Sequence, residues 1–129
     1  TSEQYMMHMK ALLFNDNDAA EKILATRSPY EQKALGRSVK GFDKAQWEAV
    51  CLDIMVAGLI SKFSQNLKFK KALLDTGDSE IVEASPTDRI WGIGLAEDDP
   101  RIWDKKNWRG TNWLGVVLMR TRDELRKGI

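Results

Sequence analysis

The chain of 129 residues is predicted to fold as a single, mainly helical domain with a small β element. Three observations support this fold class. Apolar residues recur at helical spacing along most of the chain, helix start signals precede those runs, and one short run beyond residue 79 has the features of a strand. The length is typical of one domain, and 43% hydrophobic residues are enough for a packed core.

Four helices are expected before residue 67. Each has a side chain at its start that can accept a hydrogen bond from the first free backbone N–H groups. The third start is the clearest, because Ser28 is followed by proline at the first helical position. The expected helices run from Ser2 to Leu13, from Asp18 past Leu24, from Ser28 to Gly36 and from Asp43 to Asn66.

The second half of the chain changes in character. Asn66 is expected to cap a short helix that passes Leu74 and closes at Gly77. Residues 80–84 are expected to form a short strand, because Ser85 and Pro86 mark a turn after them. Residues 85–112 show no periodicity, and residues 113–127 return to the helical pattern.

Composition excludes several classes of protein. The chain has 20 basic and 19 acidic residues, whereas a protein that holds duplex DNA by charge is clearly basic. The single cysteine, Cys51, allows no internal disulfide and no cysteine-based metal site. His8 has no second metal-ligating residue at a suitable spacing. No metal and no cofactor are therefore expected. One unpaired thiol favours a cytoplasmic location, and no apolar run suggests a membrane span.

The irregular segment 85–112 is the most informative part of the sequence, since compact domains rarely keep such segments without a use. It contains Trp91, Trp103 and Trp108 among aspartate, asparagine and arginine residues. Indole rings stack on bases, and guanidinium groups bind phosphate in pairs of hydrogen bonds. The segment therefore suits a nucleotide-like ligand. The alternative is structural, with the tryptophans packed in the core and the aspartates capping turns.

Three stretches of the chain, in this order, resemble the NADAR/YbiA-like family. They are Ser2-Glu3-Gln4-Tyr5, residues 84–95 (ASPTDRIWGIGL) and residues 107–115 (NWRGTNWLG). The resemblance covers residues 1–129 as one domain of this family that lacks the family's usual N-terminal segment. It implies that part of the binding site is either missing from this chain or supplied by a second chain.

The resemblance implies hydrolysis of an N-glycosidic bond in an ADP-ribosyl or ribosyl-phosphate compound. The first expectation is removal of ADP-ribose from a modified nucleobase, carried by a small molecule or by a single-stranded or flipped base in nucleic acid. Two alternatives stay open. One is a module that binds NAD or ADP-ribose without catalysis, and the other is an N-glycosidase of a riboflavin-pathway ribosylaminopyrimidine phosphate.

The resemblance also implies site residues. Such a reaction needs a carboxylate near the anomeric carbon and a way to neutralise the leaving nitrogen. The expected catalytic residues are Glu3, Asp88 and Asp104. Glu3 is favoured for the first role because the start of a helix stabilises an ionised carboxylate. The expected substrate-binding residues are Lys10, Trp91, Gly92, Trp108, Arg109, Gly110 and Asn112.

Overall fold

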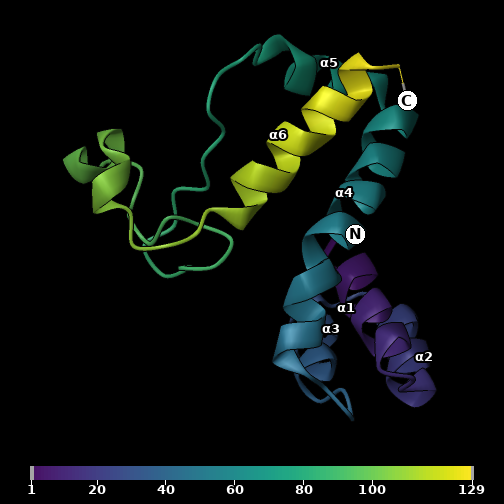
Figure 1. Ribbon diagram of the computed structural model, residues 1–129. Helices are drawn as coiled ribbons and strands as arrows, with labels where there is room; N and C mark the ends of the chain where they lie inside the picture. Colours follow the sequence, from purple (N-terminus) through teal and green to yellow (C-terminus); the bar gives the residue numbers. More distant parts are fainter. Residues whose placement is uncertain (1, 129) are drawn as a thin grey trace. The chain divides into compact units, whose positions relative to one another are not determined.

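The computed structural model of the protein describes the backbone from Ser2 to Gly128 and the side chains from Gln4 to Gly128. It divides into two compact units, residues 1–58 and residues 59–129. The described residues form six α-helices and two short 3₁₀-helices (Figure 1). The predicted mainly helical fold is confirmed. The helix α4 (Lys44–Gln65) begins in the first unit and ends in the second.

The first unit is built from α1 (Ser2–Leu13), α2 (Asn17–Ala25), α3 (Pro29–Arg37) and the first part of α4. The Asp16 carboxylate caps α2 by accepting a hydrogen bond from the Ala19 N–H, so this helix begins slightly earlier than predicted. The predicted cap of α3 is confirmed, since Ser28 Oγ accepts from the Glu31 N–H. The core consists of Ala11, Ala19, Ala20, Ile23 and Val39, against which Met7, Phe14 and Leu35 pack.

Gln4 explains the end of α2. Its side-chain amide donates to the carbonyl oxygens of Ile23, Leu24 and Thr26, at 3.1, 3.3 and 3.2 Å. The last carbonyl groups of a helix have no partner within the helix, so a side-chain donor at this position stabilises its end. The Gln4 side chain thereby holds α1 against α2.

The second unit contains the rest of α4, α5 (Leu67–Asp75), the 3₁₀-helices η1 (Pro100–Trp103) and η2 (Lys105–Asn107), and α6 (Trp113–Arg126). Asn66 caps α5 as predicted, accepting from the Phe69 N–H. Helices α5 and α6 pack against each other. The buried Arg122 of α6 donates to Thr76 Oγ1 and to the Ser79 carbonyl, at 2.9 and 2.8 Å, and so fixes the chain that leaves α5.

The predicted strand at residues 80–84 is wrong. No strand occurs anywhere in the described residues 2–128. The reason is that this segment forms its hydrogen bonds with a side chain and not with a neighbouring strand. The Glu83 N–H donates to Asn112 Oδ1 and the Ile81 carbonyl accepts from Asn112 Nδ2, each at 2.9 Å. One residue of a parallel strand would bond to these two groups in the same way. The segment is extended, but a side-chain amide replaces the neighbouring strand.

Cys51 is buried on α4. Burial raises the pKa of its thiol, which favours the neutral form of the side chain. Among the described residues no helix combines the length and apolar character that a membrane crossing requires.

Candidate functional site

The two specific motifs of the second unit lie side by side. Figure 1 shows, in green, a long excursion that leaves α5, carries η1 and η2, and returns to the start of α6. We call residues 81–94 and 108–114 of this excursion the double loop. Backbone N–H groups of the later segment donate to carbonyl oxygens of the earlier one. The pairs are Arg109 to Ile93 at 2.7 Å, Thr111 to Arg89, Asn112 to Gly92 and Trp113 to Ile90 at 3.0 Å each, and Leu114 to Trp91 at 3.1 Å.

Asn112 lies at the centre of the double loop. Its backbone is left-handed, with φ of 53°, and only 2% of the residue is exposed. Asparagine tolerates this conformation better than most residues. Its amide group holds Ile81 and Glu83, as described above. The predicted substrate-binding role of Asn112 stays a prediction, and the structure assigns its side chain a structural role.

Two glycines allow the motifs to approach this closely. A Cβ atom at Gly110 would lie 2.2 Å from the Gly92 carbonyl oxygen and 2.8 Å from the Arg89 Cα. Gly94 has a φ of 71°, and a Cβ there would lie 2.9 Å from the Arg109 Cβ. The absence of side chains at these positions is thus explained by packing within the double loop. The predicted contact of Gly92 and Gly110 with substrate remains untested.

The predicted carboxylates of the second unit cap turns. Asp88 Oδ1 accepts from the N–H groups of Ile90 and Trp91, at 3.0 and 2.8 Å. Asp104 Oδ1 accepts from the Lys106 N–H at 3.0 Å, at the start of η2. Both aspartates thus have the structural role that was the alternative for this segment. In each of them the hydrogen bonds use one carboxylate oxygen, Oδ1.

The two predicted tryptophans occupy different environments. Trp91 packs edge-to-face against Trp113, with ring centroids 5.7 Å apart. Trp108 donates its indole N–H to the Ile102 carbonyl at 2.8 Å, and Lys105 Nζ lies 5.8 Å from the centre of its ring. Trp91 is therefore fixed by an aromatic neighbour, whereas Trp108 leaves part of its ring facing a groove.

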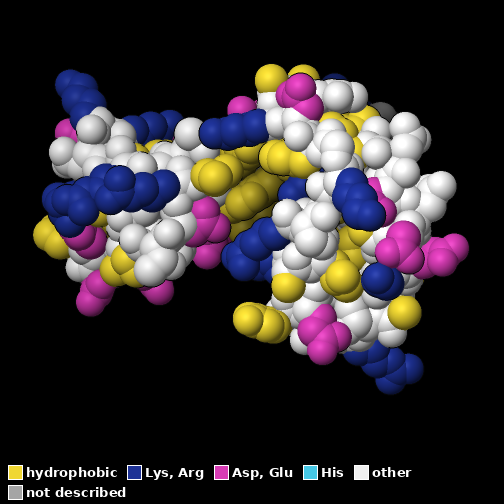
Figure 2. Space-filling model, turned by 90° about the horizontal axis from the view of Figure 1, so that it is seen from below, with side chains coloured by type: hydrophobic (Ala, Val, Ile, Leu, Met, Phe, Trp, Pro, Cys, Tyr) yellow, Lys and Arg dark blue, Asp and Glu magenta, His cyan; other side chains and the backbone are white. Residues whose placement is uncertain are grey.

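Arg89 and Arg109 form a cationic pair on the double loop. The stems of both side chains lie beside Gly94. A Cβ atom added at Gly94 would lie 3.2 Å from the Arg89 Cγ and 2.9 Å from the Arg109 Cβ. Both residues are exposed, and in the described part of the chain neither forms an ion pair with a carboxylate. Figure 2 shows several Lys and Arg side chains on the lobe at the left of the view, which carries the excursion. Arg109 is close enough to Asp99 for its charge to help lower the pKa of that carboxyl. Two exposed arginines with neighbouring side-chain stems suit an anionic ligand.

Arg101 behaves differently from this pair. It binds the Asp99 carboxylate, with Arg101 Nη2 2.7 Å from Asp99 Oδ2. The hydrogen bonds from the Arg101 side chain and backbone hold the pKa of Asp99 at about 2. Asp99 also caps η1, so this ion pair fixes the short helix that ends at Trp103.

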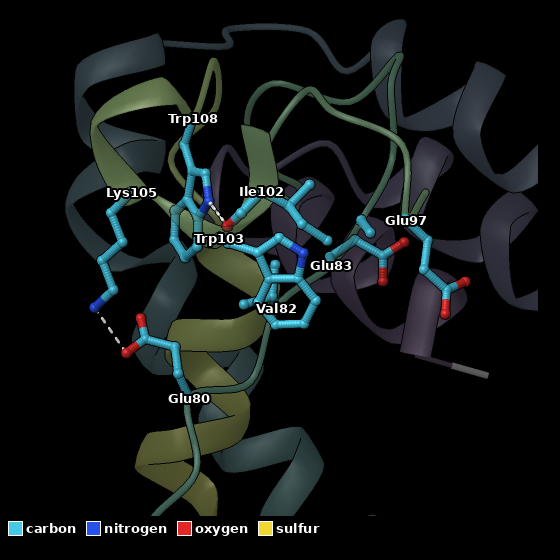
Figure 3. Close-up of a pocket in the computed structure, with 9 residues that line it drawn as sticks. Glu80, Val82, Glu83, Glu97, Ile102, Trp103, Lys105 and Trp108 are labelled. Carbon is cyan, nitrogen blue, oxygen red and sulfur yellow. Dashed lines mark hydrogen bonds and ion pairs between the residues drawn. The ribbon is translucent and has the colours of Figure 1, made fainter. Parts of the chain in front are cut away.

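A groove of about 700 Å³ lies on the second unit, within the size range of ligand sites (Figure 3). It is lined by Glu80, Val82, Glu83, Ala84, Glu97, Ile102, Trp103, Lys105 and Trp108. Of the predicted site residues whose side chains the structure describes, only Trp108 is among them. The three glutamates were missed, because each is ordinary in sequence and only the excursion brings residues 80–84 beside residues 97–108. The one available signal was Trp103, an aromatic residue in a polar, proline-containing turn.

The remaining predicted residues, Glu3 and Lys10, belong to the first unit. The side chain of Glu3 lies outside the described residues. Lys10 Nζ lies 4.4 Å from the centre of the Phe42 ring. Burial, and secondarily the nearby Arg37, lower the pKa of Lys10. The predicted roles of Glu3 and Lys10 stay predictions. Within residues 4–128, no three or more histidine, cysteine or acidic side chains gather closely enough to hold a metal ion.

Comparisons with known proteins place these observations in context. A family model described as the NADAR domain matches residues 1–126. The chain is 48% identical over 127 residues to "Protein irg-1" of Caenorhabditis elegans, covering 96% of this chain and 59% of that protein. It is 45% identical over 124 residues to "N-glycosidase R617" of Acanthamoeba polyphaga mimivirus, covering 96% of this chain and 73% of that protein. The chain thus spans about three fifths and three quarters of these relatives.

A solved structure is also similar. The NMR structure of the Escherichia coli protein YbiA matches with a TM-score of 0.78 and 30% sequence identity, covering 99% of this chain and 68% of that one. The resemblance noted from the three sequence stretches is confirmed.

Proposed function

Because this chain belongs to the NADAR domain family, we propose that it hydrolyses the N-glycosidic bond of an ADP-ribosyl compound and removes ADP-ribose from a modified nucleobase. The name of the relative R617, an N-glycosidase, supports the reaction class. The observation that carries the choice of substrate is the pair of exposed arginines, Arg89 and Arg109, on either side of Gly94.

Two arginines whose side-chain stems lie beside the same glycine can reach two adjacent phosphates. Each can donate two parallel hydrogen bonds to phosphate oxygens. A diphosphate uses both groups, whereas a ribosyl monophosphate needs only one. The pair therefore favours ADP-ribosyl compounds over the ribosylaminopyrimidine phosphate that remains the alternative enzyme substrate.

We assign the reacting carboxylate to Glu3. An N-glycosidic bond breaks through a transition state with positive charge on the ribose, which an ionised carboxylate stabilises before water attacks C1′. Asp88 and Asp104 each use an oxygen to cap a turn. Glu3 belongs to the first turn of α1, and the start of a helix in general favours an ionised carboxylate. The Trp-rich double loop would contact the leaving base, which departs with a proton from water or a neighbouring acid.

Replacing Glu3 with glutamine is expected to lower kcat for release of ADP-ribose from ADP-ribosyl-guanine by about 100-fold to 10,000-fold, because the charge is lost while the shape is kept. Product release is measured by chromatography, and circular dichroism checks the fold. The matched control is Glu21→Gln, an exposed glutamate of α2, which is expected to leave kcat unchanged. Full activity of Glu3→Gln would contradict the mechanism. Tight binding of ADP-ribose by the unaltered protein without any product would favour the non-catalytic module instead.

The double substitution Arg89→Ala, Arg109→Ala is expected to raise KM for the ADP-ribosyl substrate about 10-fold to 100-fold, since charge-assisted hydrogen bonds to the diphosphate are lost. Arg27→Ala, which removes an exposed arginine of the first unit, serves as the control. The same assay with a ribosylaminopyrimidine phosphate separates the two substrates. A better kcat/KM for that monophosphate would transfer the proposal to the riboflavin-pathway reaction.

A further inference from the structure

The groove lined by Trp103 and residues 80–84 does not suit the diphosphate of the proposed substrate. It has three glutamates and one lysine on its walls. We propose that it binds an extended segment of a partner protein that carries lysine or arginine, and that this segment pairs as a strand with the outer edge of residues 80–84. Three features of the groove support this inference, and none of them depends on the glycosidase reaction.

The first feature is an open backbone edge. Successive residues of an extended chain direct their N–H and C=O groups to opposite sides. The groups of Ile81 and Glu83 face the double loop, because Asn112 and the Ile93 N–H bind them. The groups of Val82 consequently face the other way, and the chain turns at Ala84, where the Ser85 N–H donates to the Glu83 carbonyl oxygen at 3.2 Å. In the described part of the chain no hydrogen bond joins the N–H or C=O of Val82 or Ala84 to another group. Such an edge is a template for another strand.

The second feature is an exposed indole beside this edge. Trp103 is 87% exposed and Val82 is 36% exposed. Figure 3 shows the Trp103 ring next to Val82, in the middle of the groove. The ring stands on η1, which Asp99 caps and Pro100 begins, so its backbone is well fixed. Tryptophan is usually largely buried, and an exposed one on a firm support is typical of binding surfaces.

The third feature is the charge of the groove. Lys105 Nζ lies 2.7 Å from Glu80 Oε2, which neutralises one end. Glu83 and Glu97 lie on the other side of Trp103 (Figure 3), and neither has an ion-pair partner among the described residues. A cationic side chain there would meet two carboxylates and the face of an indole, which attracts cations. A free polyamine could satisfy the charges, but only a peptide also satisfies the backbone edge.

The test is titration of the whole chain with a blocked heptapeptide of alternating valine and lysine, followed by NMR of the backbone amides. We expect binding with the largest shifts at Val82, Ala84 and Trp103. Methylating alternate backbone nitrogens of the peptide is expected to weaken binding at least about 10-fold, because strand pairing is blocked. The same peptide with glutamate in place of lysine is expected not to bind.

Variants of the protein test the same three features. Val82→Pro removes one edge N–H that has no partner among the described residues, and Trp103→Ala removes the indole. Each is expected to weaken binding about 10-fold or more, as is the double change Glu83→Gln, Glu97→Gln. Leu67→Ala removes an exposed apolar side chain of α5 and is the matched control, with unchanged binding. Circular dichroism checks each fold, and the methylated peptide tests strand pairing even if one variant fails to fold.

Four results would overturn the proposal. Equal binding of the methylated peptide, or equal binding of spermine, would mean that the groove takes cations through side chains alone. Absence of binding at millimolar peptide would mean that the edge is not a docking site. Self-association of the chain that Val82→Pro abolishes would mean that the occupant is a second copy.

Discussion

Replacing Asn112 with alanine is expected to lower the free energy of unfolding by about 2–4 kcal/mol. The substitution leaves the Ile81 carbonyl and the Glu83 N–H without the partners that each now has at 2.9 Å, and a half-buried group that loses its hydrogen bond costs about 1–3 kcal/mol. It also places alanine in a left-handed conformation that asparagine tolerates better. Urea unfolding followed by tryptophan fluorescence measures the change.

The control for this experiment is Asn107→Ala. Asn107 is an exposed residue at the end of η2, and its loss is expected to change stability by less than about 0.5 kcal/mol. Amide hydrogen exchange provides a local readout, because the Glu83 N–H should lose its protection in Asn112→Ala. Equal stability of the two variants, with Glu83 still protected, would show that the Asn112 amide does not hold the double loop.

Replacing Gly110 with alanine is expected to destabilise the second unit by about 3 kcal/mol. The added methyl group would lie 2.2 Å from the Gly92 carbonyl oxygen, so the two segments of the double loop must separate. The backbone hydrogen bonds from Arg109, Thr111 and Asn112 would lengthen together. We expect lower protection of these amides and weaker binding of ADP-ribose, because Arg89 and Arg109 lose their common support.

Gly77→Ala is the matched control for this substitution. Gly77 has a φ of 62°, and a Cβ there would meet nothing within 4 Å. The only expected cost is that of left-handed backbone, about 1 kcal/mol. The pair thus separates a steric effect from a conformational one. If Gly110→Ala were no more costly than Gly77→Ala, the close packing of the two motifs would be contradicted.

The helices could be predicted because their signals are local. Ser28 with Pro29, Asp43 and Asn66 each cap the helix that follows within a few residues. The strand at residues 80–84 could not be judged in this way, because a strand exists only if a partner strand is present. Here the partner is the side chain of Asn112, 29 residues beyond Glu83, and no pattern near residue 80 reveals it.

The candidate site shows the same limit. The sequence identified the segment 85–112 as unusual and, through the family resemblance, identified its two motifs. It could not show that Asp88 and Asp104 cap turns or that Gly110 serves close packing. Groove residues such as Glu97 carry no distinguishing signal, since their position depends on the path of the whole excursion. The sequence shows which functional groups are present. Only the fold shows which of them already form structural hydrogen bonds.

The pairing of the double loop also sets an order of events when the chain folds. Helices α1 to α3 contact one another over short sequence distances, so they can form as soon as they are synthesised. The double loop is closed by residues 109–114, and its longest side-chain link, from Asn112 to Ile81, spans 31 residues. Closing a loop of this length costs entropy before any contact compensates for it. On the ribosome, Arg89 and Arg109 therefore come together only after the start of α6 has left the exit tunnel.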